Sequence, residues 1–329
     1  MPNKRRKTRR KYTPLKRTTS RKHTARRNQG FRKNPALISL IIILAMLAIF
    51  YFGRDDGLFF GELNISGDFA VHFIDIGQGD AILIQNSYNE FMLIDTGDGR
   101  QWTKLSSYLE RFGVRELKYV VLSHPHADHI GSAHRIVREY SIGTLIMPPV
   151  TNNTQVFRNL LDAMDERNLA PTRPEPGAVF QFGDAEFKII APLYEGYANI
   201  NNYSVVILMQ HGSNRFLFTG DMERQSENEI INRGLDIRAD VLAVAHHGSA
   251  TSSQASFLNL IRPSLAVIQV AEGNQFNHPN MQVVGRLEDV GADILRNDWH
   301  GDIIIISDGH DLTVHTSAGN YSGRFAAAH

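Results

Sequence analysis

Three histidines and one aspartate lie within six residues in the segment 124–129, which reads His-Pro-His-Ala-Asp-His. The apolar run 118–122 precedes this segment and is predicted to form a buried strand. A turn after that strand would direct the first two histidines one way, and the aspartate and the last histidine another way. Imidazole nitrogen and carboxylate oxygen suit Zn²⁺ or Mn²⁺. The segment therefore predicts a site for a divalent metal.

Further candidate residues lie where other predicted strands end. They are Asp75, Asp95, Asp221, the pair His246 and His247 with Ser249 behind it, and His278 in a later loop. Functional side chains on layered sheets commonly lie at strand ends and in the loops that follow them. The Asp221 carboxylate could bridge two metals there.

The elements that must position these residues alternate along the chain. Strands are predicted at 71–77, 81–86, 90–94, 118–122, 144–147, 178–182, 185–191, 204–211, 215–219, 240–245, 265–270, 293–296, 302–306 and 311–315. Helices are predicted at 101–112, 131–140, 153–168, 223–233, 254–261 and 280–290. Each half begins with strands, and helices intervene later. This order predicts an α+β fold with two sheets face to face and helices outside, not one doubly wound parallel sheet.

Composition separates a basic N-terminus from an acidic remainder. The 329-residue chain has 35 Lys and Arg against 34 Asp and Glu, yet residues 1–35 hold 15 of the basic residues and no acidic one. Such a segment cannot bury enough apolar surface to fold alone, so we expect a disordered tail that could bind nucleic acid or anionic lipid. The chain has no cysteine, which excludes disulfides, thiolate metal sites and a cysteine nucleophile.

A membrane anchor is predicted directly after the tail. The stretch from Ala36 to Phe52 has no charged residue and is about 25 Å long as a helix, which is enough for a bilayer core. The basic tail predicts a cytoplasmic N-terminus, with the remainder outside the cell membrane. A cleaved signal peptide is the alternative, although no small-residue cleavage site follows. The expected boundaries are a tail at 1–35, a transmembrane helix at 36–53, a linker at 54–69, a globular domain at 70–320 and a flexible C-terminus at 321–329.

Several motifs of the globular part resemble a known family. The His-x-His-x-Asp-His segment, preceded by LIDTG and followed by FTGD, resembles the metallo-β-lactamase superfamily. More narrowly, HFIDIGQGDAILI, NNYSVVI, LFTGDM, VLAVAHHGSATSS and NQFNHP resemble the hydrolase-like C-terminal domain of ComEC-type DNA-uptake proteins. The resemblance covers about residues 70–310 and implies a four-layer αββα sandwich. The tail and the single span lie outside it.

The resemblance also implies roles for particular residues. His124 and His126 would hold one metal, Asp128 and His129 the second, and Asp221 would bridge them. A later histidine would complete the set: His246 or His247 is favoured, and His278 is a competitor. The remaining expectations are Asp95 orienting a ligand, with Asp75, Asp80, Asn202 and Ser249 supporting the site or contacting substrate. The implied cofactor is one or two Zn²⁺ ions, with Mn²⁺ as the alternative.

One departure from the superfamily concerns the first metal. Many members place a further histidine ligand between the His-x-His-x-Asp-His segment and the bridging aspartate. The expected position falls at Asn201-Asn202-Tyr203-Ser204 in this chain. Asn202 is then either a weak ligand or a substrate contact, which places full occupancy of both metal positions in question.

The expected activity is metal-dependent hydrolysis of a phosphodiester, with single-stranded DNA as the favoured substrate. Two metals about 3.5–4 Å apart generate hydroxide from water near neutral pH, and Asp128, His246, His247 or His278 would assist at the reacting centre. The acidic globular part disfavours tight binding of duplex DNA. Two alternatives stay open: a hydrolase of a lactone, a β-lactam-like amide or a small phosphodiester, and a non-catalytic module that binds DNA or a partner.

Overall fold

The strands form two sheets in the computed structural model, which describes residues 65–326. The first sheet has eight strands in the order β15-β14-β13-β1-β2-β3-β4-β5. Its strands are β1 (Phe69–Phe73), β2 (Ile82–Gln85), β3 (Phe91–Ile94), β4 (Glu116–Val121), β5 (Ser141–Ile146), β13 (Ile303–Ser307), β14 (Asp311–Thr316) and β15 (Ser322–Ala326). Pairs β3–β4 and β4–β5 are parallel, and the other pairs are antiparallel.

The second sheet has seven strands in the order β12-β11-β10-β9-β8-β7-β6. Its strands are β6 (Val179–Phe182), β7 (Ala185–Ala191), β8 (Val206–His211), β9 (Asn214–Phe218), β10 (Val241–Ala243), β11 (Leu265–Ile268) and β12 (Asp293–Arg296). Strands β9 to β12 are parallel to one another. The predicted hairpin joins β8 and β9, and Gly212 in its tight turn has a φ of 57°, which glycine adopts without strain.

The two sheets pack face to face through a shared apolar core. Alternate side chains of strands from both sheets meet there, among them Phe73, Phe187, Phe216 and Phe218. Strands near the middle of each sheet are buried on both faces, as β1 shows with five buried residues, of which only His72 is polar. That pattern is typical of strands covered on one face by the other sheet and on the opposite face by helices.

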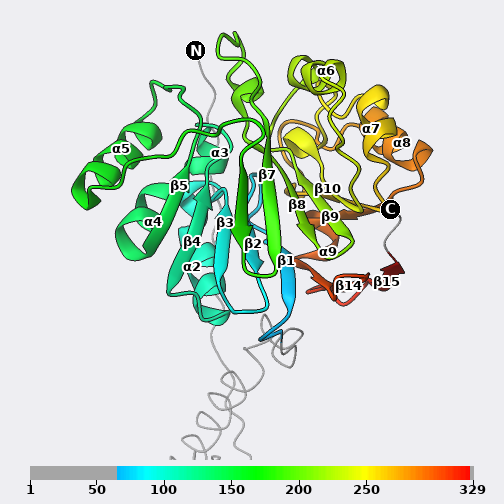
Figure 1. The fold of residues 1–329 in the computed structure, drawn as a ribbon, viewed down its shortest axis with the longest axis horizontal. Coiled ribbons are helices and arrows are strands. Elements are labelled where there is room, and N and C mark those ends of the chain that lie inside the picture. The colour runs from blue at the N-terminus through cyan, green and yellow to red at the C-terminus, as the bar shows by residue number, and fades with distance from the viewer. Residues whose placement is uncertain (1–64, 327–329) are drawn as a thin grey trace, which may run out of the picture. The chain divides into compact units, whose positions relative to one another are not determined.

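Helices cover the outer faces of the sheets (Figure 1). The helices are α2 (Trp102–Arg111), α3 (Ala127–Ile130), α4 (Ala133–Glu139), α5 (Gln155–Arg167), α6 (Arg224–Asn232), α7 (Ala255–Ile261), α8 (Met281–Asp289) and α9 (Asn297–His300). Helices α2, α4 and α5 share an apolar cluster with the first sheet, and α6, α7 and α8 share one with the second. The arrangement has four layers, helix–sheet–sheet–helix, as expected.

Local sequence signals explain where the longer helices begin and end. Thr154 accepts a hydrogen bond from the Phe157 amide and caps the start of α5, and Asn168 ends the helix in a left-handed conformation. Asn280 caps α8 in the same way through the Gln282 amide. The six predicted helices are confirmed, and each predicted end lies within two residues of the observed one.

The topology places many strand ends at a common edge. Strands β3 and β4 of the first sheet, and β9, β10 and β11 of the second, belong to parallel pairs. The segments after these strands carry Asp95, His124, Asp221, His247 and Gln269 in turn. Ligand sites in sheets of parallel strands lie at the carboxyl ends of the strands.

The limits of the globular part differ from the expected ones. Ile65 is buried and packs with Ala70 and Ile304, so the end of the expected linker at 54–69 belongs to the fold. The expected flexible C-terminus at 321–329 is wrong for residues 322–326, because they form β15 and pair with β14. The predicted tail and transmembrane helix lie outside the described residues. Within residues 65–326, no helix is long and apolar enough to cross a membrane.

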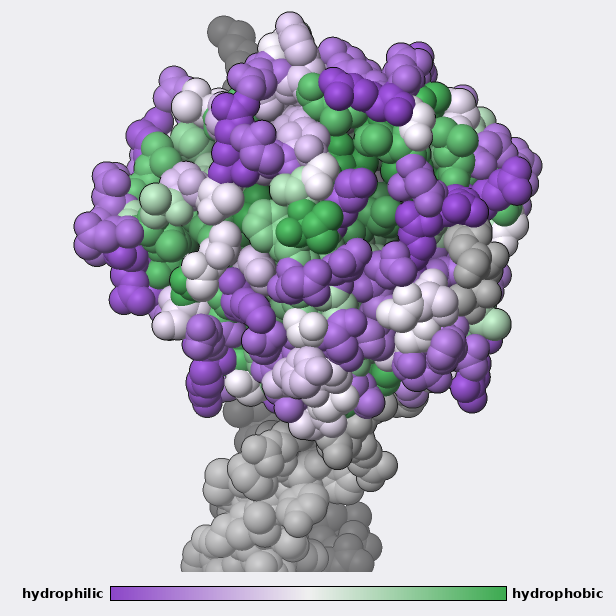
Figure 2. Space-filling view, in the orientation of Figure 1, coloured by the Kyte–Doolittle hydropathy of each residue, from purple (hydrophilic) through white to green (hydrophobic). Residues whose placement is uncertain are grey.

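Exposed apolar side chains are present on the outside of the described part. Figure 2 shows hydrophobic residues across the middle of one face, with hydrophilic residues around them. Val179 of β6 is 51% exposed, and β6 is the last strand of its sheet. Tyr194 and Phe276 are exposed to a similar extent, at 54% and 53%, and both belong to loops.

A buried histidine in β1 predicts that the fold is sensitive to acid. His72 is completely buried, its Nδ1 lies 3.0 Å from the Tyr108 hydroxyl, and burial lowers its pKa from 6.5 to about 3. At a pH between about 3 and 6.5, His72 binds a proton in the unfolded chain but not in the folded chain. The contribution of His72 to the free energy of unfolding is therefore complete above pH 6.5, and up to about 4–5 kcal/mol of it is lost as the pH falls to 3.

Denaturant unfolding at several pH values between 3 and 7 measures this loss. Phenylalanine in the variant His72→Phe cannot bind a proton, so its free energy of unfolding should fall less steeply with decreasing pH than that of the unaltered chain. The comparison of slopes removes the contribution of other histidines, which both proteins share. Equal slopes for the two proteins would contradict the assignment.

Candidate metal centre

The segment after β4 forms a tight turn that ends in the short helix α3. The amide of Ile130 donates to the carbonyl of His126 at 2.9 Å, which closes the helical turn. The carbonyl of Asp128 accepts from the amide of Asp80 at 3.1 Å, so the loop after β1 is tied to this turn. The next residue, Gly131, lies so close to Gly97 and Gly99 that a Cβ atom would be 2.2 Å from the Gly99 nitrogen. Backbone contacts from two other segments therefore fix the turn.

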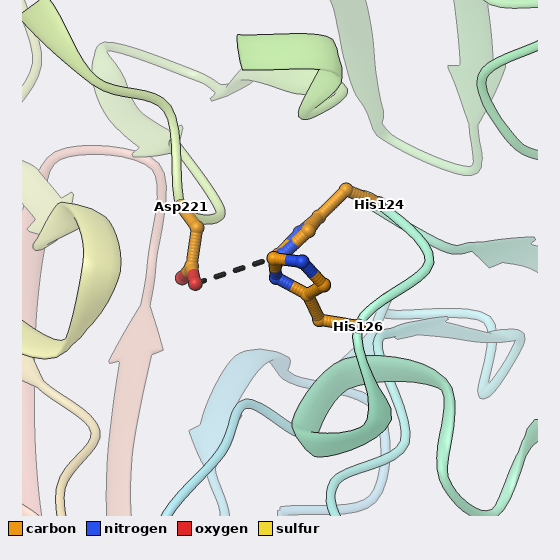
Figure 3. A group of neighbouring side chains, drawn as sticks. All are labelled: His124, His126 and Asp221. Carbon is orange, nitrogen blue, oxygen red and sulfur yellow. Dashed lines mark hydrogen bonds and ion pairs between the residues drawn. The ribbon is translucent and has the colours of Figure 1, made fainter. Parts of the chain in front are cut away.

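The first group of candidate ligands consists of His124, His126 and Asp221. Figure 3 shows the two imidazoles reaching from the turn after β4 toward the carboxylate, which belongs to the segment after β9. One ligand atom from each residue lies within 4.8 Å of the others. The Nε2 atom of His124 is 3.6 Å from Asp221 Oδ2 and 2.9 Å from His126 Nδ1. His124 is completely buried, whereas His126 is partly exposed.

The second group consists of Asp128, His129 and His247. Ligand atoms of these residues also lie within 4.8 Å of one another. The His247 Nε2 atom is 3.4 Å from Asp128 Oδ2, and His129 Nε2 is 3.2 Å from Asp221 Oδ1. Both histidines are buried.

Asp221 stands between the two groups and presents one oxygen to each. Its Oδ2 faces His124 Nε2 at 3.6 Å, and its Oδ1 faces His129 Nε2 at 3.2 Å and His247 Nε2 at 3.7 Å. The Ser204 hydroxyl accepts from the Asp221 amide at 3.0 Å and holds the backbone at this point. A carboxylate placed in this way has the geometry of a bridging ligand.

Outer residues fix the orientation of the histidines. Asp95 Oδ2 lies 2.8 Å from His129 Nδ1, and the other Asp95 oxygen accepts from the Ser123 amide at 2.7 Å. Asp95 is thus placed to orient a ligand, as expected. His247 Nδ1 lies 2.9 Å from the Gln269 carbonyl and 3.3 Å from Asp80 Oδ1. These contacts direct the Nε2 atoms of both histidines toward Asp221.

Unpartnered polar atoms test whether these residues fit a metal. Among the buried side-chain atoms of residues 65–326 that make no hydrogen bond are three at this site: His129 Nε2, His247 Nε2 and Asp221 Oδ1. Buried polar atoms almost always have partners, and these three face one another. They are nitrogen and oxygen ligand types that divalent cations prefer. The residues therefore fit the divalent metal that this fold implies.

The charges of the site support the same conclusion. Burial opposes ionisation of Asp221, but His129, His247 and His124 outweigh it and hold the pKa of that carboxyl well below its usual range. Burial likewise opposes protonation of His129, yet Asp221 and Asp95 raise its pKa well above the ordinary value. The carboxylates thus favour positive charge at the positions that a cation would occupy.

The structure separates the three histidines between which the sequence left a choice. His247 belongs to the second group, whereas His246 lies outside both groups, with its Nε2 3.7 Å from Asp221 Oδ2. The geometry therefore places His247 in the second group and leaves His246 at the edge of the first, beside Asp221 Oδ2. The ring of His278 is 5.7 Å from that of His246 and 6.4 Å from that of His247, so His278 borders the site.

The backbone explains why the two adjacent histidines differ. His246 and His247 both have a φ of 53°, in the left-handed region that side chains other than glycine rarely adopt. They lie in the 3₁₀ turn Ala245–Gly248 after β10. This conformation directs His247 into the second group and His246 to the edge of the site beside Asp221 Oδ2. Residues held in such a conformation cluster at functional sites.

Three other expected residues have different environments. Asn202 lies in the 3₁₀ turn Ile200–Tyr203, and its Oδ1 accepts from the amides of Glu223 and Ser226, at 3.0 and 3.3 Å, at the start of α6. Its carbonyl oxygen is therefore engaged in holding α6. Ser249 contacts Thr251, with 3.0 Å between the hydroxyls. Asp75 pairs with Lys104 at 2.7 Å.

Sequence reasoning missed Ser123, Ser204, Glu223 and Gln269. Glu223 Oε1 lies 3.4 Å from His246 Nδ1 and accepts from Asn201 Nδ2 at 3.1 Å. Glu223 lies two residues after Asp221. This position next to a candidate ligand is the sequence signal that could have identified it. Gln269 contributes its backbone carbonyl, which no residue type reveals.

Comparison with known proteins decides the family. A family model described as the metallo-beta-lactamase superfamily matches residues 74–271. The chain belongs to the metallo-beta-lactamase superfamily. Its curated relatives include ComE operon protein 3 of Bacillus subtilis (strain 168), 30% identical over 256 residues, which are 73% of this chain and 33% of that protein. Competence protein ComA of Neisseria gonorrhoeae is 28% identical over 234 residues, which are 70% and 31% of the two chains.

These matches confirm the expected likeness to the metallo-beta-lactamase superfamily and to ComEC-type competence proteins. The chain spans about a third of the length of these curated relatives. Among solved structures, Igni18, described as a novel metallo hydrolase from the hyperthermophilic archaeon Ignicoccus hospitalis, aligns with a TM-score of 0.50 at 15% identity. That alignment covers 71% of this chain and 98% of Igni18, and it shows that the two chains share a fold.

Proposed function

We propose that this chain is a metal-dependent hydrolase that cleaves phosphodiester bonds of single-stranded DNA. The observation that carries the proposal is the position of Asp221, whose two oxygens face two separate groups of candidate ligands. Names of relatives that refer to competence favour a nucleic-acid substrate over a β-lactam or a lactone. The retention of a nearly complete ligand set favours an enzyme over a binding module.

Zn²⁺ is the proposed metal, with Mn²⁺ as the alternative, and Asp221 is the proposed bridge. His124 and His126 would hold the first cation, and Asp128, His129 and His247 the second. Divalent cations held in this way polarise a phosphoryl group and supply a nucleophile from water near neutral pH. Asp95 and the Gln269 carbonyl keep the Nε2 atoms of two ligands pointed inward.

His278 is the candidate that is left to face the substrate. Its Nδ1 atom is buried and has no hydrogen-bond partner within residues 65–326. Burial, together with His247 and His246, lowers the pKa of His278 to about 4, so its ring is neutral near pH 7. A neutral imidazole offers one N–H donor and one acceptor. We propose that His278 donates a hydrogen bond to an oxygen of the substrate phosphate.

The location of the enzyme is a further proposal, which rests on the sequence. We propose that residues 36–53 anchor it in the cell membrane by a single span, with a cytoplasmic N-terminus and the metal centre outside. The basic tail at 1–35 then lies on the other side of the membrane from the site and does not bind its substrate.

Phe276 is predicted to stack on a base of the substrate. Its ring is 53% exposed, its amide donates to Asn274 Oδ1 at 3.1 Å, and it stacks on His278 with 5.7 Å between ring centroids. An aromatic ring fixed at the edge of a site is typical of proteins that bind single strands, where stacking contributes about 1–3 kcal/mol per base. The variant Phe276→Ala should therefore bind a thymidine dinucleotide about tenfold or more weakly.

A dinucleotide without bases isolates this effect, because it has the same phosphodiester. Phe276→Ala should cleave it as the unaltered chain does, and Phe276→Trp should keep the preference for the thymidine dinucleotide. KM values for both substrates provide the measurement. An equal change for both substrates in Phe276→Ala would show that the residue does not recognise a base.

The function itself is tested on the purified full-length chain with Zn²⁺ and with Mn²⁺. The substrates are single-stranded DNA, duplex DNA and bis(p-nitrophenyl) phosphate, and the double variant His126→Ala, Asp128→Ala is the control. Cleavage of single-stranded DNA by the unaltered chain alone is the expected result. Cleavage of the small ester alone would favour a small-molecule hydrolase. A metal-free, inactive protein that still binds DNA would favour a binding module.

A further inference from the structure

The first group of candidate ligands has one residue fewer than the second group when the shared Asp221 is counted in both. His124, His126 and Asp221 are three candidate ligands, and the nearby Asn202 side chain is turned toward α6. The second group has Asp128, His129 and His247 in addition to the shared carboxylate. A further ligand for the first cation would have to come from another segment.

His246 is placed to fill this role from the opposite side. Its Nε2 atom lies 3.7 Å from Asp221 Oδ2, the same oxygen that faces His124 Nε2 at 3.6 Å. Its Nδ1 atom faces Glu223 Oε1 at 3.4 Å and the Thr251 hydroxyl at 3.3 Å. The side chain is 21% exposed, so the ring lies at the edge of the site and is held from behind.

The contacts behind the ring decide which atom of His246 faces the site. Glu223 Oε1 and the Thr251 hydroxyl both lie at Nδ1, so Nε2 is the ring atom directed at Asp221 Oδ2. An imidazole nitrogen and a carboxylate oxygen that face one another are both ligand types that divalent cations prefer. Histidines that bind metals commonly have such a carboxylate behind them.

The Asn-Asn-Tyr-Ser segment supports this arrangement through three residues. Asn201 Nδ2 donates to Glu223 Oε1 at 3.1 Å, and Asn202 Oδ1 accepts from the Glu223 amide at 3.0 Å. Ser204 Oγ accepts from the Asp221 amide at 3.0 Å. Both asparagines are buried. The segment thus holds the carboxylate that orients His246 and the backbone of the bridging carboxylate together.

We propose that His246 is a ligand of the first cation and that Glu223 is the positioning residue that presents it. The Asn-Asn-Tyr-Ser segment supports this ligand indirectly, by holding Glu223 and the backbone of Asp221. This inference rests on the proposed function only in requiring a cation beside Asp221 Oδ2, and it does not depend on the substrate.

Zinc titration of the metal-depleted full-length chain tests the proposal without an activity assay. The unaltered chain should bind two Zn²⁺ ions. His246→Ala should weaken one of the two affinities strongly and leave the other. Glu223→Ala should weaken the same one by about 10- to 100-fold, the usual effect of removing a residue behind a ligand. Glu223→Gln should restore most of it, because its amide oxygen still accepts from Nδ1.

Glu229→Ala is the matched control, since Glu229 lies in α6 but pairs with the Tyr197 hydroxyl. Thermal unfolding of each metal-free variant shows whether it is folded. Two unchanged affinities in a folded His246→Ala would overturn the ligand assignment. Equal losses in Glu223→Gln and Glu223→Ala would overturn the positioning role. A chain that binds two ions and cleaves nothing would refute the proposed function and leave this inference standing.

Discussion

Asp221→Asn is expected to lose both cations and all measurable hydrolysis. The substitution keeps the size of the side chain but leaves only one oxygen, so the residue can no longer serve both groups of ligands. The buried NH₂ group would face either His124 Nε2 or the pair His129 and His247, which the carboxylate oxygens now face. Removal of a residue behind a ligand costs about 10- to 100-fold, and loss of a shared ligand should cost more.

The loss of the negative charge adds to the effect. Asp221 raises the pKa of His129 and of His247 against the opposing effect of burial, so the carboxylate favours positive charge at the site. Zinc content by elemental analysis and phosphodiesterase rate are the measurements. Asp236→Asn is the control, because Asp236 pairs with Arg238 and Arg215 on the surface. Two zinc ions retained by Asp221→Asn would contradict the bridging role.

Gly131→Ala is expected to destabilise the protein by about 3 kcal/mol or more and to weaken zinc binding. A Cβ atom at this position would lie 2.2 Å from the Gly99 nitrogen and 2.5 Å from the carbonyl oxygens of Ala127 and Gly97. All three are backbone atoms, so no side chain can rotate away. The chain between β3 and α2 must move, and it begins with Asp95, which holds His129.

Gly285→Ala is the matched control, and this substitution is expected to stabilise the protein. Gly285 lies within α8, and nothing lies within 4 Å of a Cβ atom built there. Alanine should stabilise this helix by about 0.5–1 kcal/mol. Melting temperatures of the two variants should therefore move in opposite directions. A Gly131→Ala protein with unchanged stability and zinc affinity would contradict the argument that backbone contacts fix the turn.

Much of the fold and the site could be predicted because their signals are local. The His-x-His-x-Asp-His turn after an apolar strand gave four candidate ligands, and the structure places all four in the two groups that flank Asp221. The helices carried apolar residues at helical spacing, and most strands were continuous apolar runs. The layered arrangement follows from that order because both faces of such strands have to be covered.

The distinction between His246 and His247 could not be predicted from spacing. Adjacent residues in an ordinary strand or helix point in directions that the pattern reveals. Here both residues have a positive φ, and a conformation stabilised by contacts elsewhere in the fold decides which ring reaches which oxygen of Asp221. The sequence carries no local signal for such a conformation in residues other than glycine and asparagine.

The role of Asn202 and the existence of β15 could not be predicted, for related reasons. The role of Asn202 depends on the start of α6, which lies about twenty residues further along the chain, so its capping contact is not local. Strand β15 is partly exposed in an alternating pattern and ends the sheet. It owes its conformation to pairing with β14 and not to a strong apolar run of its own.

The most direct test of the account is a crystal structure of the zinc-loaded chain with diffraction recorded at the zinc absorption edge. The account predicts two anomalous peaks, one beside Asp221 Oδ2 near His124 and His126, and one beside Oδ1 near His129 and His247. Each peak should lie about 2.0–2.2 Å from its ligand atoms. A map without a peak between Asp221 and the turn at 124–129 would contradict the proposal that this chain is a metal-dependent hydrolase.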